Sequence, residues 1–556
     1  MDRDQILSPR AVDGMIAEGS TIVIYEDMIL KLDGWMERHP GGRLAVLHMV
    51  GRDATDEMKA YHSERTLRSM KPYRIGRKQG SWVNRTPPIR GGIFHKEGEP
   101  LVSSATSSAS DTEGSVGDSV SSASSLCSCG NDLTHKDCTL HHRSTASSPR
   151  PEPVEVVNKR TTTIRVANAA VAREIEKDLA TYPCVSAGVQ EDIARKYQSL
   201  HQRVKDEGLY ECPYIEYGKE MLRYSTLFAA FAFFLHLQWY TTSAVFLGTF
   251  WHQIMFTAHD AGHLAITSNF VTDTLIGMFV ADFCCGLSIG WWKSSHNVHH
   301  LVTNQPEHDP DIQNVPIFAT CYSFFKSLHS TYYDFTFVWD AVADFLVPFQ
   351  AYTYYPIMGV ARFNLYLLSW LHVLSSKSSS LGKSRAWWIR PAEISFMACY
   401  WFLFGYCLVW RTLPTWTIRV IFVLVSHIVT MPLHVQITLS HWGMSHNDLG
   451  ESESFAQRQL RTTMDVDCPA WLDFYHGGLQ FQAVHHLFPR VPRHNLRKVQ
   501  FMIREFCADT GVPYSILNFT DGNKKVLGRL QDVGDQVKIM LKCQKHMALT
   551  GESGLQ

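Results

Sequence analysis

The stretch from Tyr224 to His259 contains no Asp, Glu, Lys or Arg. One membrane-spanning helix needs about 20 mostly apolar residues, so this stretch is too long for one crossing and long enough for two short ones. Gln238, Trp239 and Tyr240 stand in its middle, and aromatic side chains of this kind prefer the membrane–water interface. The stretch therefore predicts a transmembrane helical hairpin with its turn at the far interface.

A second hairpin is predicted from residues 394–439, where the segment RTLPTWTIR interrupts the apolar sequence. Arg411 and Arg419 would place positive charge at its turn, against the usual tendency of membrane proteins. The apolar runs 264–292 and 341–373 contain charged residues, so we expect them to lie at the interface or inside the protein. The pattern predicts a core of four spans.

Three histidine clusters accompany these hairpins. They are HDAGH, with His259 and His263; HNVHH, with His296, His299 and His300; and QAVHH, with Gln482, His485 and His486. Residues spaced i, i+3 and i+4 share one face of a helix, so the imidazoles of each cluster can converge. Two hairpins return the chain to its starting face, which lets all three clusters meet. Independent core histidines would not need this arrangement, and we interpret it as a metal site.

The number of histidines bears on which metal is bound. The clusters contain seven, and His441 in LSHWG is a further candidate, which is more than one tetrahedral zinc ion uses. Imidazole suits iron as well as zinc. Two iron ions are the better match, and a redox metal at a membrane surface suggests dioxygen chemistry on a lipid chain.

The N-terminal stretch LDGWMERHPGGRLAVLHMVGRDATDEMKAYHS has two further histidines of interest. His39 stands in HPGG, where Gly41 and Gly42 allow a tight turn with the backbone close to a flat ligand. His62 follows in a second turn, and the pair could clamp one haem. An HPGG tetrapeptide alone is also an ordinary turn, and His62 or His48 could be a plain surface or core residue.

The composition changes abruptly between Leu101 and Arg150, where serine is frequent and large apolar residues are scarce. Such a segment cannot bury enough surface to offset the entropy of ordering, so we predict a disordered linker. Its cysteines and histidines could be taken for a zinc knuckle, but their C-x-C spacing departs from the usual zinc patterns. They are Cys127, Cys129, Cys138, His141 and His142.

HDAGH, HNVHH and QAVHH resemble the three histidine boxes of membrane fatty-acyl and sphingolipid desaturases, and the glutamine that opens the third box resembles front-end desaturases. The tracts WWKSSHNVHHLVTNQPEHDPDIQ and HGGLQFQAVHHLFPRVPRHNLR most resemble delta-8 sphingolipid desaturases of fungi and plants, the fungal enzymes above all. The N-terminal stretch resembles the cytochrome b5 haem-binding fold, which is fused to front-end desaturases.

This resemblance implies a non-haem di-iron centre that uses dioxygen to remove two hydrogens from the long-chain base of ceramide. The implied catalytic residues and iron ligands are His259, His263, His296, His299, His300, Gln482, His485 and His486. Membrane desaturases place a further ligand between the second and third boxes, for which His441 is our candidate, ahead of His434 and His476. The implied axial haem ligands are His39 and His62.

The predicted fold class is an α+β cytochrome b5-like haem domain joined by a disordered linker to an all-α, multi-span membrane desaturase domain. The predicted boundaries are residues 1–80 for the haem domain, 81–163 for the Ser-rich linker, 164–223 for a pre-membrane helical segment, 224–515 for the di-iron desaturase domain and 516–556 for a C-terminal tail.

The resemblance also implies the cofactors and partners. The cofactors are haem b and two non-haem iron ions, the substrate is ceramide or a long-chain base, and NADH-cytochrome b5 reductase is the electron source. The implied location is the endoplasmic reticulum membrane, with the haem domain and the histidine boxes facing the cytosol. Acidic and basic residues nearly cancel, 53 against 52, so there is no electrostatic argument for a nucleic-acid partner.

Three other functions remain open from the sequence. A fatty-acyl or sphingoid hydroxylase has similar boxes, but its third box usually begins with histidine, where this chain has Gln482. A delta-5 or delta-6 acyl-lipid desaturase acting on fatty acids would use the same boxes. A membrane-anchored haem protein that only relays electrons would leave the three histidine clusters unexplained.

Overall fold

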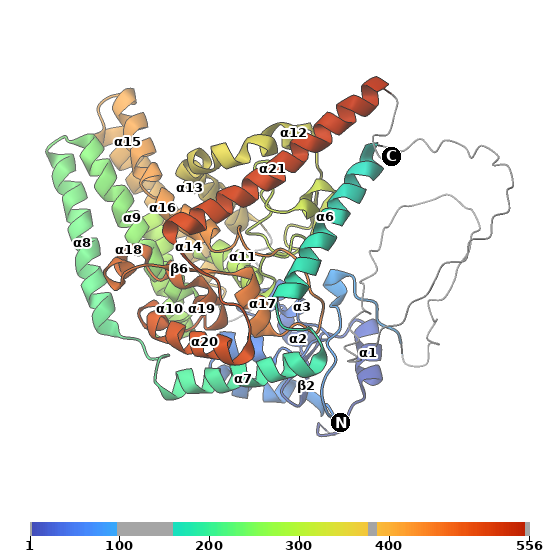
Figure 1. Ribbon diagram of the computed structural model, residues 1–556. Coiled ribbons are helices and arrows are strands. Elements are labelled where there is room, and N and C mark those ends of the chain that lie inside the picture. The colour runs from blue at the N-terminus through green and yellow to red at the C-terminus, as the bar shows by residue number, and fades with distance from the viewer. Residues whose placement is uncertain (1–2, 97–158, 376–385, 551–556) are drawn as a thin grey trace.

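The computed structural model describes residues 3–96, 159–375 and 386–550. Residues 3–96 form a small α+β unit, which we call the N-terminal domain, and residues 159–550 form a larger helical body, the helical domain. The N-terminal domain, blue in Figure 1, packs against the lower side of the helical domain in that view. The Ser-rich segment and the cluster from Cys127 to His142 lie outside the described residues.

The N-terminal domain surrounds a three-stranded antiparallel sheet in the order β1-β2-β3. Its elements are α1 (Pro9–Ala17), β1 (Ile22–Tyr25), β2 (Met28–Lys31), α2 (Asp33–Met36), α3 (Arg43–Leu47), α4 (Thr55–Tyr61), α5 (Glu64–Ser69) and β3 (Arg74–Arg77). Successive side chains of a strand point to opposite faces. Ile22 and Ile24 therefore enter one apolar cluster while Val23 and Tyr25 enter another, and the sheet is buried on both sides.

Packing of the N-terminal domain continues beyond the predicted start of the linker at residue 81. The Trp82 indole N–H donates to the carbonyl of Gly51 at 3.0 Å, and the Asn84 side-chain oxygen accepts from the amide of Asp53 at 2.7 Å. On the far side, α6 (Lys159–Thr181) begins a few residues before the predicted end of the linker at 163. The domain boundaries otherwise stay predictions.

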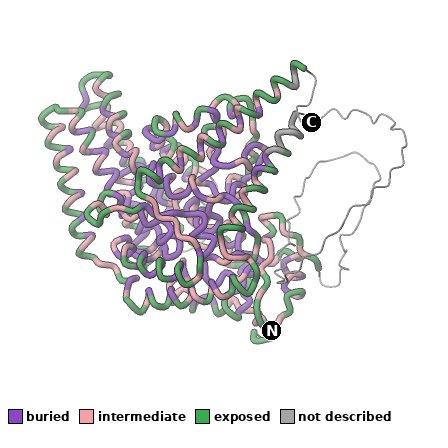
Figure 2. The backbone as a smooth tube through the Cα atoms, viewed as in Figure 1, coloured by how far each residue is buried: buried purple, intermediate pink, exposed green. Residues whose placement is uncertain are grey.

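The helical domain begins with α6 and α7 (Ala187–Asp206), which are followed by a helical hairpin. The two helices of the hairpin are α8 (Tyr214–His236) and α9 (Tyr240–Gly262). Helices α8 and α9 form the hairpin predicted from residues 224–259, and Gln238, with a positive φ of 59°, stands in its turn. Figure 2 shows that exposed and half-buried residues prevail along α8, whereas the centre of the helical domain is buried.

The remaining elements are mostly helical. They are α10 (Phe270–Gly277), a π-helical segment (Met278–Cys284), α11 (Ile289–Leu301), β4 (Leu328–Ser330), β5 (Phe335–Phe337), α12 (Ala341–Leu346), α13 (Gln350–Leu374), α14 (Ile389–Tyr400), a second π-helical segment (Trp401–Thr412), α15 (Trp416–Ile428), α16 (Met431–Leu439), α17 (Phe455–Thr462), β6 (Asp465–Asp467), α18 (Asp473–His476), α19 (Gln482–Leu487), α20 (Leu496–Thr510), β7 (Ile516–Asn518) and α21 (Phe519–Thr550).

Three described helical stretches are long and apolar enough to cross a membrane: Ala341–Leu374, Ile389–Thr412 and Trp416–Leu439. The pair Phe270–Cys284 and Ile289–Leu301, bent by 115°, adds a fourth if it counts as one broken span. The second predicted hairpin is thereby confirmed as two such helices, whereas α8 and α9 of the first are not among these candidate spans, so their crossing of the membrane stays a prediction. The chain is a membrane protein of the multi-span, helical class that the sequence predicted.

Residues 341–373 were predicted to lie at the interface or inside the protein, whereas in the structure Ala341–Leu374 is long and apolar enough to be a candidate span. Its central charge, Arg362, is fully buried, and its guanidinium donates to the carbonyl of Cys285 at 2.9 Å and to the hydroxyl of Tyr366 at 2.9 Å. A charge that is hydrogen-bonded inside a helix bundle does not need water. The number of charged residues in the sequence therefore understated how well this helix can span a membrane.

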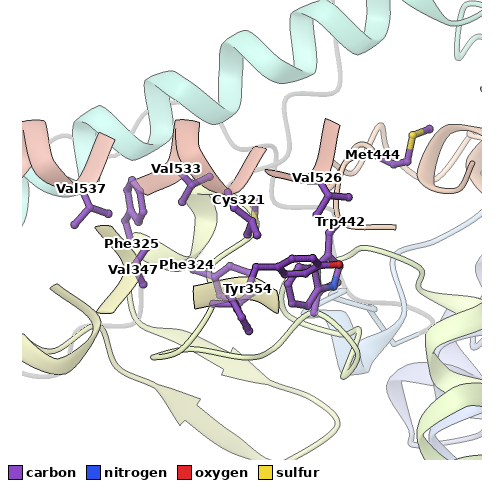
Figure 3. Close-up of a cluster of buried hydrophobic side chains, with 14 of the residues drawn as sticks. Cys321, Phe324, Phe325, Val347, Tyr354, Trp442, Met444, Val526, Val533 and Val537 are labelled. Carbon is purple, nitrogen blue, oxygen red and sulfur yellow. The ribbon is translucent and has the colours of Figure 1, made fainter. Parts of the chain in front are cut away.

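The C-terminal helix α21 closes the helical domain on the side away from the N-terminal domain. Its Val526, Val533 and Val537 are fully buried in an apolar cluster with side chains such as Phe324 and Trp442 (Figure 3). The same cluster includes Tyr354 of α13 and Leu439 of α16, so it holds both helices against α21. Because α16 leads directly to His441, the cluster also supports the site described next.

Candidate metal centre and the interdomain cavity

Four histidines from three helices form the first group, which we call the four-histidine group. They are His259, His263, His296 and His485, with candidate ligand atoms all within 4.8 Å of one another. They come from the end of α9, from α11 and from α19. A Cβ on Gly262 would lie 2.1 Å from the Trp292 ring, so only glycine lets the end of α9 approach α11 this closely.

The second group, the three-histidine group, contains His299, His441 and His486, again with ligand atoms within 4.8 Å. His299 lies on α11 in the turn after His296, and His486 follows His485 on α19. Helices α11 and α19 therefore each contribute a histidine to both groups. His441, two residues beyond α16, lies where the resemblance places a further ligand.

Two further predicted residues lie near the groups. The His300 ring stacks on that of His486 with centroids 4.1 Å apart, and its Nε2 lies 2.9 Å from Nε2 of His296. His300 thus stands between the groups. Gln482 is buried, and its side-chain oxygen has no hydrogen-bond partner in the described part of the chain.

The two weaker candidates belong to neither group. His434 Nδ1 lies 3.1 Å from the carbonyl oxygen of Met358, and His476 Nδ1 lies 2.6 Å from the side-chain oxygen of Gln436. The structure therefore favours His441 over both.

Several ring nitrogens of these groups are buried without a hydrogen-bond partner among the described residues. They are Nε2 of His259, His263, His485 and His486, and Nδ1 of His300 and His441. An unsatisfied buried polar group costs about 1–3 kcal/mol, so several in one place call for a ligand. Burial and the neighbouring imidazoles hold the pKa of His485 and His486 well below the usual value. Neutral imidazole is the form that binds a metal, and the residues fit two ions.

Two side chains outside the predicted set orient these histidines. Asp309 accepts a hydrogen bond from Nδ1 of His299 at 2.8 Å, and Gln459 on α17 accepts one from Nδ1 of His486 at 2.9 Å. Each bond leaves Nε2 of the imidazole free for a metal. Asp309 stands in the tract QPEHDPDIQ after the second cluster, whereas nothing in the spacing around Gln459 marked it.

A buried ionic network ties the third cluster to the first. Arg493, seven residues after His486, forms ion pairs with Asp260 and with Glu220, and it donates to the carbonyl of Phe256 at 2.9 Å. Asp260 follows His259 directly. The network therefore fixes the loop after α19 against the end of α9.

A cavity of about 310 Å³ lies between the two domains, and we call it the interdomain cavity. His39 and His62 line it with ring centroids 5.9 Å apart. Their Nδ1 atoms lie 2.9 Å and 3.0 Å from the carbonyl oxygens of Gly42 and Met58, so Nε2 of each ring keeps its lone pair. A metal–imidazole bond is about 2 Å long, which leaves room for one metal atom held by both rings.

The backbone around His39 explains the two glycines of HPGG. A Cβ on Gly41 would lie 2.9 Å from Cε1 of His39, and Gly42 has a φ of +91°. Larger residues would displace the imidazole or strain the turn. Burial lowers the pKa of His39, and it lowers that of His62 to about 4, so both rings are neutral. Apolar side chains such as Val46 line the interior, and the cavity fits a haem.

The opposite wall of the interdomain cavity belongs to the helical domain. His263, Lys293, Asn297, Leu301 and Arg490 are among the residues that line it. His263 is also a member of the four-histidine group. One side chain, His263, therefore borders both the interdomain cavity and the four-histidine group.

The comparisons with known proteins agree with this geometry. Residues 11–79 match the cytochrome b5-like heme/steroid binding domain, and residues 237–518 match the fatty acid desaturase model over half of the chain. The chain belongs to the fatty acid desaturase family. The predicted fold class, with a cytochrome b5-like domain fused to a helical desaturase domain, is confirmed.

Two relatives match the desaturase over nearly its full length, and a third matches a smaller part. It is 49% identical over 99% of its chain to the delta 8-(E)-sphingolipid desaturase of Emericella nidulans, of which 98% is covered. It is 43% identical over 98% of its chain to the protein of the same name from Candida albicans, again with 98% covered. The delta(8)-fatty-acid desaturase of Helianthus annuus is 34% identical over 62% of the chain and is covered over 75%.

These matches confirm the enzyme class, and the histidine groups of the desaturase agree with a di-iron site. The match to the cytochrome b5-like domain supports haem as the group that His39 and His62 bind. The assignment of individual ligands and catalytic residues stays a prediction. The structure adds that seven of the predicted iron ligands, His441 among them, fall into two groups of the size that two ions need.

Proposed function

We propose that the desaturase introduces a double bond between carbons 8 and 9 of the long-chain base of ceramide. The proposal draws on the full-length similarity to fungal proteins named delta 8-(E)-sphingolipid desaturase, which extends through both domains. Their names favour the E geometry for the product. The reaction removes two hydrogens from the substrate, and dioxygen takes these with two electrons and two protons to become two waters.

The four-histidine and three-histidine groups would hold one iron ion each, and iron supplies the activation of dioxygen. The protein's own part is to fix the ligands. Asp309 and Gln459 set the tautomers of His299 and His486, and the Arg493 network keeps α9 and α19 together. Gln482, whose oxygen is buried and unpartnered in the described chain, is proposed as an additional ligand.

The electrons would come from a haem b held by His39 and His62, with NADH-cytochrome b5 reductase as the external donor. One observation carries this part of the proposal: His263 lines the interdomain cavity and belongs to the four-histidine group. A fused carrier that docks in this way delivers electrons without a diffusional encounter. A membrane-anchored haem protein that only relays electrons would have no need of a haem domain docked beside the histidine groups.

We further propose that the protein lies in the endoplasmic reticulum membrane with both metal sites on the cytosolic side. The N-terminal domain packs against the histidine groups, so the two sites share one face of the membrane whichever way the chain is inserted. A cytosolic reductase can reach the haem only from that side.

The test is to express the protein in cells that lack such a desaturase and to analyse their long-chain bases by mass spectrometry. We expect a base that is two mass units lighter with its double bond at carbon 8. A hydroxylated base would favour a hydroxylase instead. His39→Ala and His62→Ala should each abolish the haem absorption band and the product while non-haem iron and membrane insertion persist.

A fatty-acyl substrate is the second candidate, because the Helianthus annuus relative is named a fatty-acid desaturase. That similarity covers a smaller part of the chain. Feeding the same cells polyunsaturated fatty acids distinguishes the two, since a delta-5, delta-6 or delta-8 acyl-lipid enzyme would desaturate these acids and leave the long-chain bases unchanged.

A further inference from the structure

Two cationic side chains line the interdomain cavity opposite the axial histidines. Lys293 lies on α11, three residues before His296, and Arg490 lies four residues after His486. Both come from the helical domain, and both stand next to a histidine box. The haem cavity therefore takes its positive charge from the domain that does not contain the axial ligands.

Neither cation has a carboxylate partner in the part of the chain that the structure describes. Lys293 lies over the Phe270 ring at 5.4 Å and Arg490 over the Tyr210 ring at 5.9 Å, and neither forms a hydrogen bond or ion pair within the described residues. Two acidic residues interact electrostatically with Lys293, and both already accept other hydrogen bonds. Asp273 accepts from Thr267, and Glu393 accepts from Ser288. Unpaired cations at a half-buried cavity are unusual and suit an anionic ligand.

The other charges of the cavity do not compensate these two. Glu57 is the acidic residue in its lining, and it is paired with Arg458 of the helical domain at 3.2 Å. Two positive charges thus remain. The interior around Val23, Leu32 and Met58 is apolar. One end of the cavity suits a flat apolar ring held by two imidazoles, and the wall of the helical domain suits two negative charges.

We propose that Lys293 and Arg490 bind the two propionate groups of the haem, so that the helical domain completes the haem site of the N-terminal domain. The inference rests on the proposed binding of haem by His39 and His62. Haem b has two carboxylates at one edge of its ring, which matches two free cations in number and charge. Ammonium and guanidinium groups form strong charge-assisted hydrogen bonds with carboxylates.

This arrangement makes haem binding and domain docking mutually dependent. Each axial bond anchors the haem to one domain and each propionate contact anchors it to the other. Tighter docking must then strengthen haem binding by the same factor that haem strengthens docking. It also directs the propionate edge of the haem towards the elements that hold the second and third boxes.

The experiment uses the full-length protein in detergent, loaded either with haem or with its dimethyl ester, which lacks both carboxylate charges. Transfer of each to excess apomyoglobin gives the rate of haem loss. The variants are Arg490→Gln, Lys293→Gln, their combination and the charge-conserving Arg490→Lys. Arg195→Gln, which removes an exposed arginine on α7, is the matched control. Non-haem iron content reports that each variant is folded.

We expect the wild type to lose the ester about tenfold faster than haem or more, and each glutamine variant to lose haem about tenfold faster than the wild type. The double variant should lose haem and ester at the same rate, whereas Arg490→Lys and Arg195→Gln should resemble the wild type. The haem reduction potential should fall in the glutamine variants. Ferric haem carries one more positive charge than ferrous haem, so removing a nearby cation stabilises the ferric form.

Equal rates for haem and ester in the wild type, or unchanged haem loss and potential in the double variant, would overturn the propionate assignment while leaving the proposed function intact. A wild-type protein that binds no haem at all would instead overturn the proposed electron carrier together with this inference.

Discussion

The phenolic oxygen of Tyr61 lies 3.5 Å from the backbone carbonyl oxygen of His300. Tyr61 precedes the predicted axial ligand His62, and His300 belongs to the second histidine box. Their rings also meet edge to face with centroids 5.9 Å apart. One aromatic side chain thus joins the two metal-binding regions across the domain interface.

Replacing Tyr61 tests whether this contact matters for electron transfer. Tyr61→Phe keeps the ring and loses only a long hydrogen bond, worth about 0.5–1.5 kcal/mol at most, so it should change little. Tyr61→Ala opens the interface, and we expect the reduced haem to be reoxidised several-fold more slowly when lipid substrate and dioxygen are present. Stopped-flow absorbance of the haem measures this rate. Equal reoxidation in the alanine variant, with its haem spectrum unchanged, would contradict the expectation.

The ion pair between Glu57 and Arg458 should stabilise the docking of the domains strongly. Both side chains are more than nine-tenths buried, so Glu57→Ala leaves an uncompensated buried charge at a cost of about 3–5 kcal/mol. Glu64→Ala breaks the more exposed pair with Lys205 and should cost less than about 1 kcal/mol. Thermal loss of the haem absorption band compares the two. Similar melting temperatures for both variants would show that the domains are not held by the buried pair.

Asp56 should make this stability depend on pH. Its burial, with the charge of Glu57 beside it, raises the pKa of Asp56 from 3.8 to about 7. A carboxyl group whose pKa is raised on folding favours the folded state while it is protonated, so its contribution is lost as pH rises from about 4 to about 7. Asp56→Asn keeps an acceptor for the Gln198 amide, which now donates at 2.8 Å. We therefore expect the melting temperature of the wild type to fall relative to this variant across that window. A constant difference would refute the shift.

Gln459 should be needed for iron binding although it is not a ligand. Gln459→Leu removes the acceptor for Nδ1 of His486, and the loss of such an orienting bond typically lowers metal affinity 10- to 100-fold, as an order of magnitude. Gln459→Glu keeps an acceptor but loses the amide donor to the His300 carbonyl, so the difference between the variants isolates the acceptor. Non-haem iron per protein, with the haem spectrum as internal control, measures it. Full iron in the leucine variant would show that His486 needs no orienting partner.

The spacing of histidines predicted that the three clusters would come together, because the spacing of side chains along a helix is a local property. His296 and His299 lie on one turn of α11 and enter different groups, as convergence of the boxes required. The helical hairpin that turns at Gln238 and the two candidate spans on either side of RTLPTWTIR were also predictable, since apolar length is read directly from the sequence.

Residues that act through distant partners were not predictable. Gln459 is an ordinary polar residue of α17 until the fold brings His486 beside it, and Arg362 is a charge in an apolar run until the carbonyl of Cys285 and the hydroxyl of Tyr366 receive it. The docking of the N-terminal domain through Glu57 and Arg458 likewise depends on residues that are far apart in the chain. No periodic spacing of residues in the sequence marks such pairs.

The two walls of the interdomain cavity are synthesised at different times. A ribosome completes His39 and His62 early, whereas Arg490 follows all three candidate spans in the chain. With the propionates bound as proposed, a haem captured by the nascent N-terminal domain would be held by His39 and His62 without Arg490 until the third box has folded. The finished chain would then retain a cofactor that the unfinished chain exchanges, and haem retention would report correct assembly in the membrane.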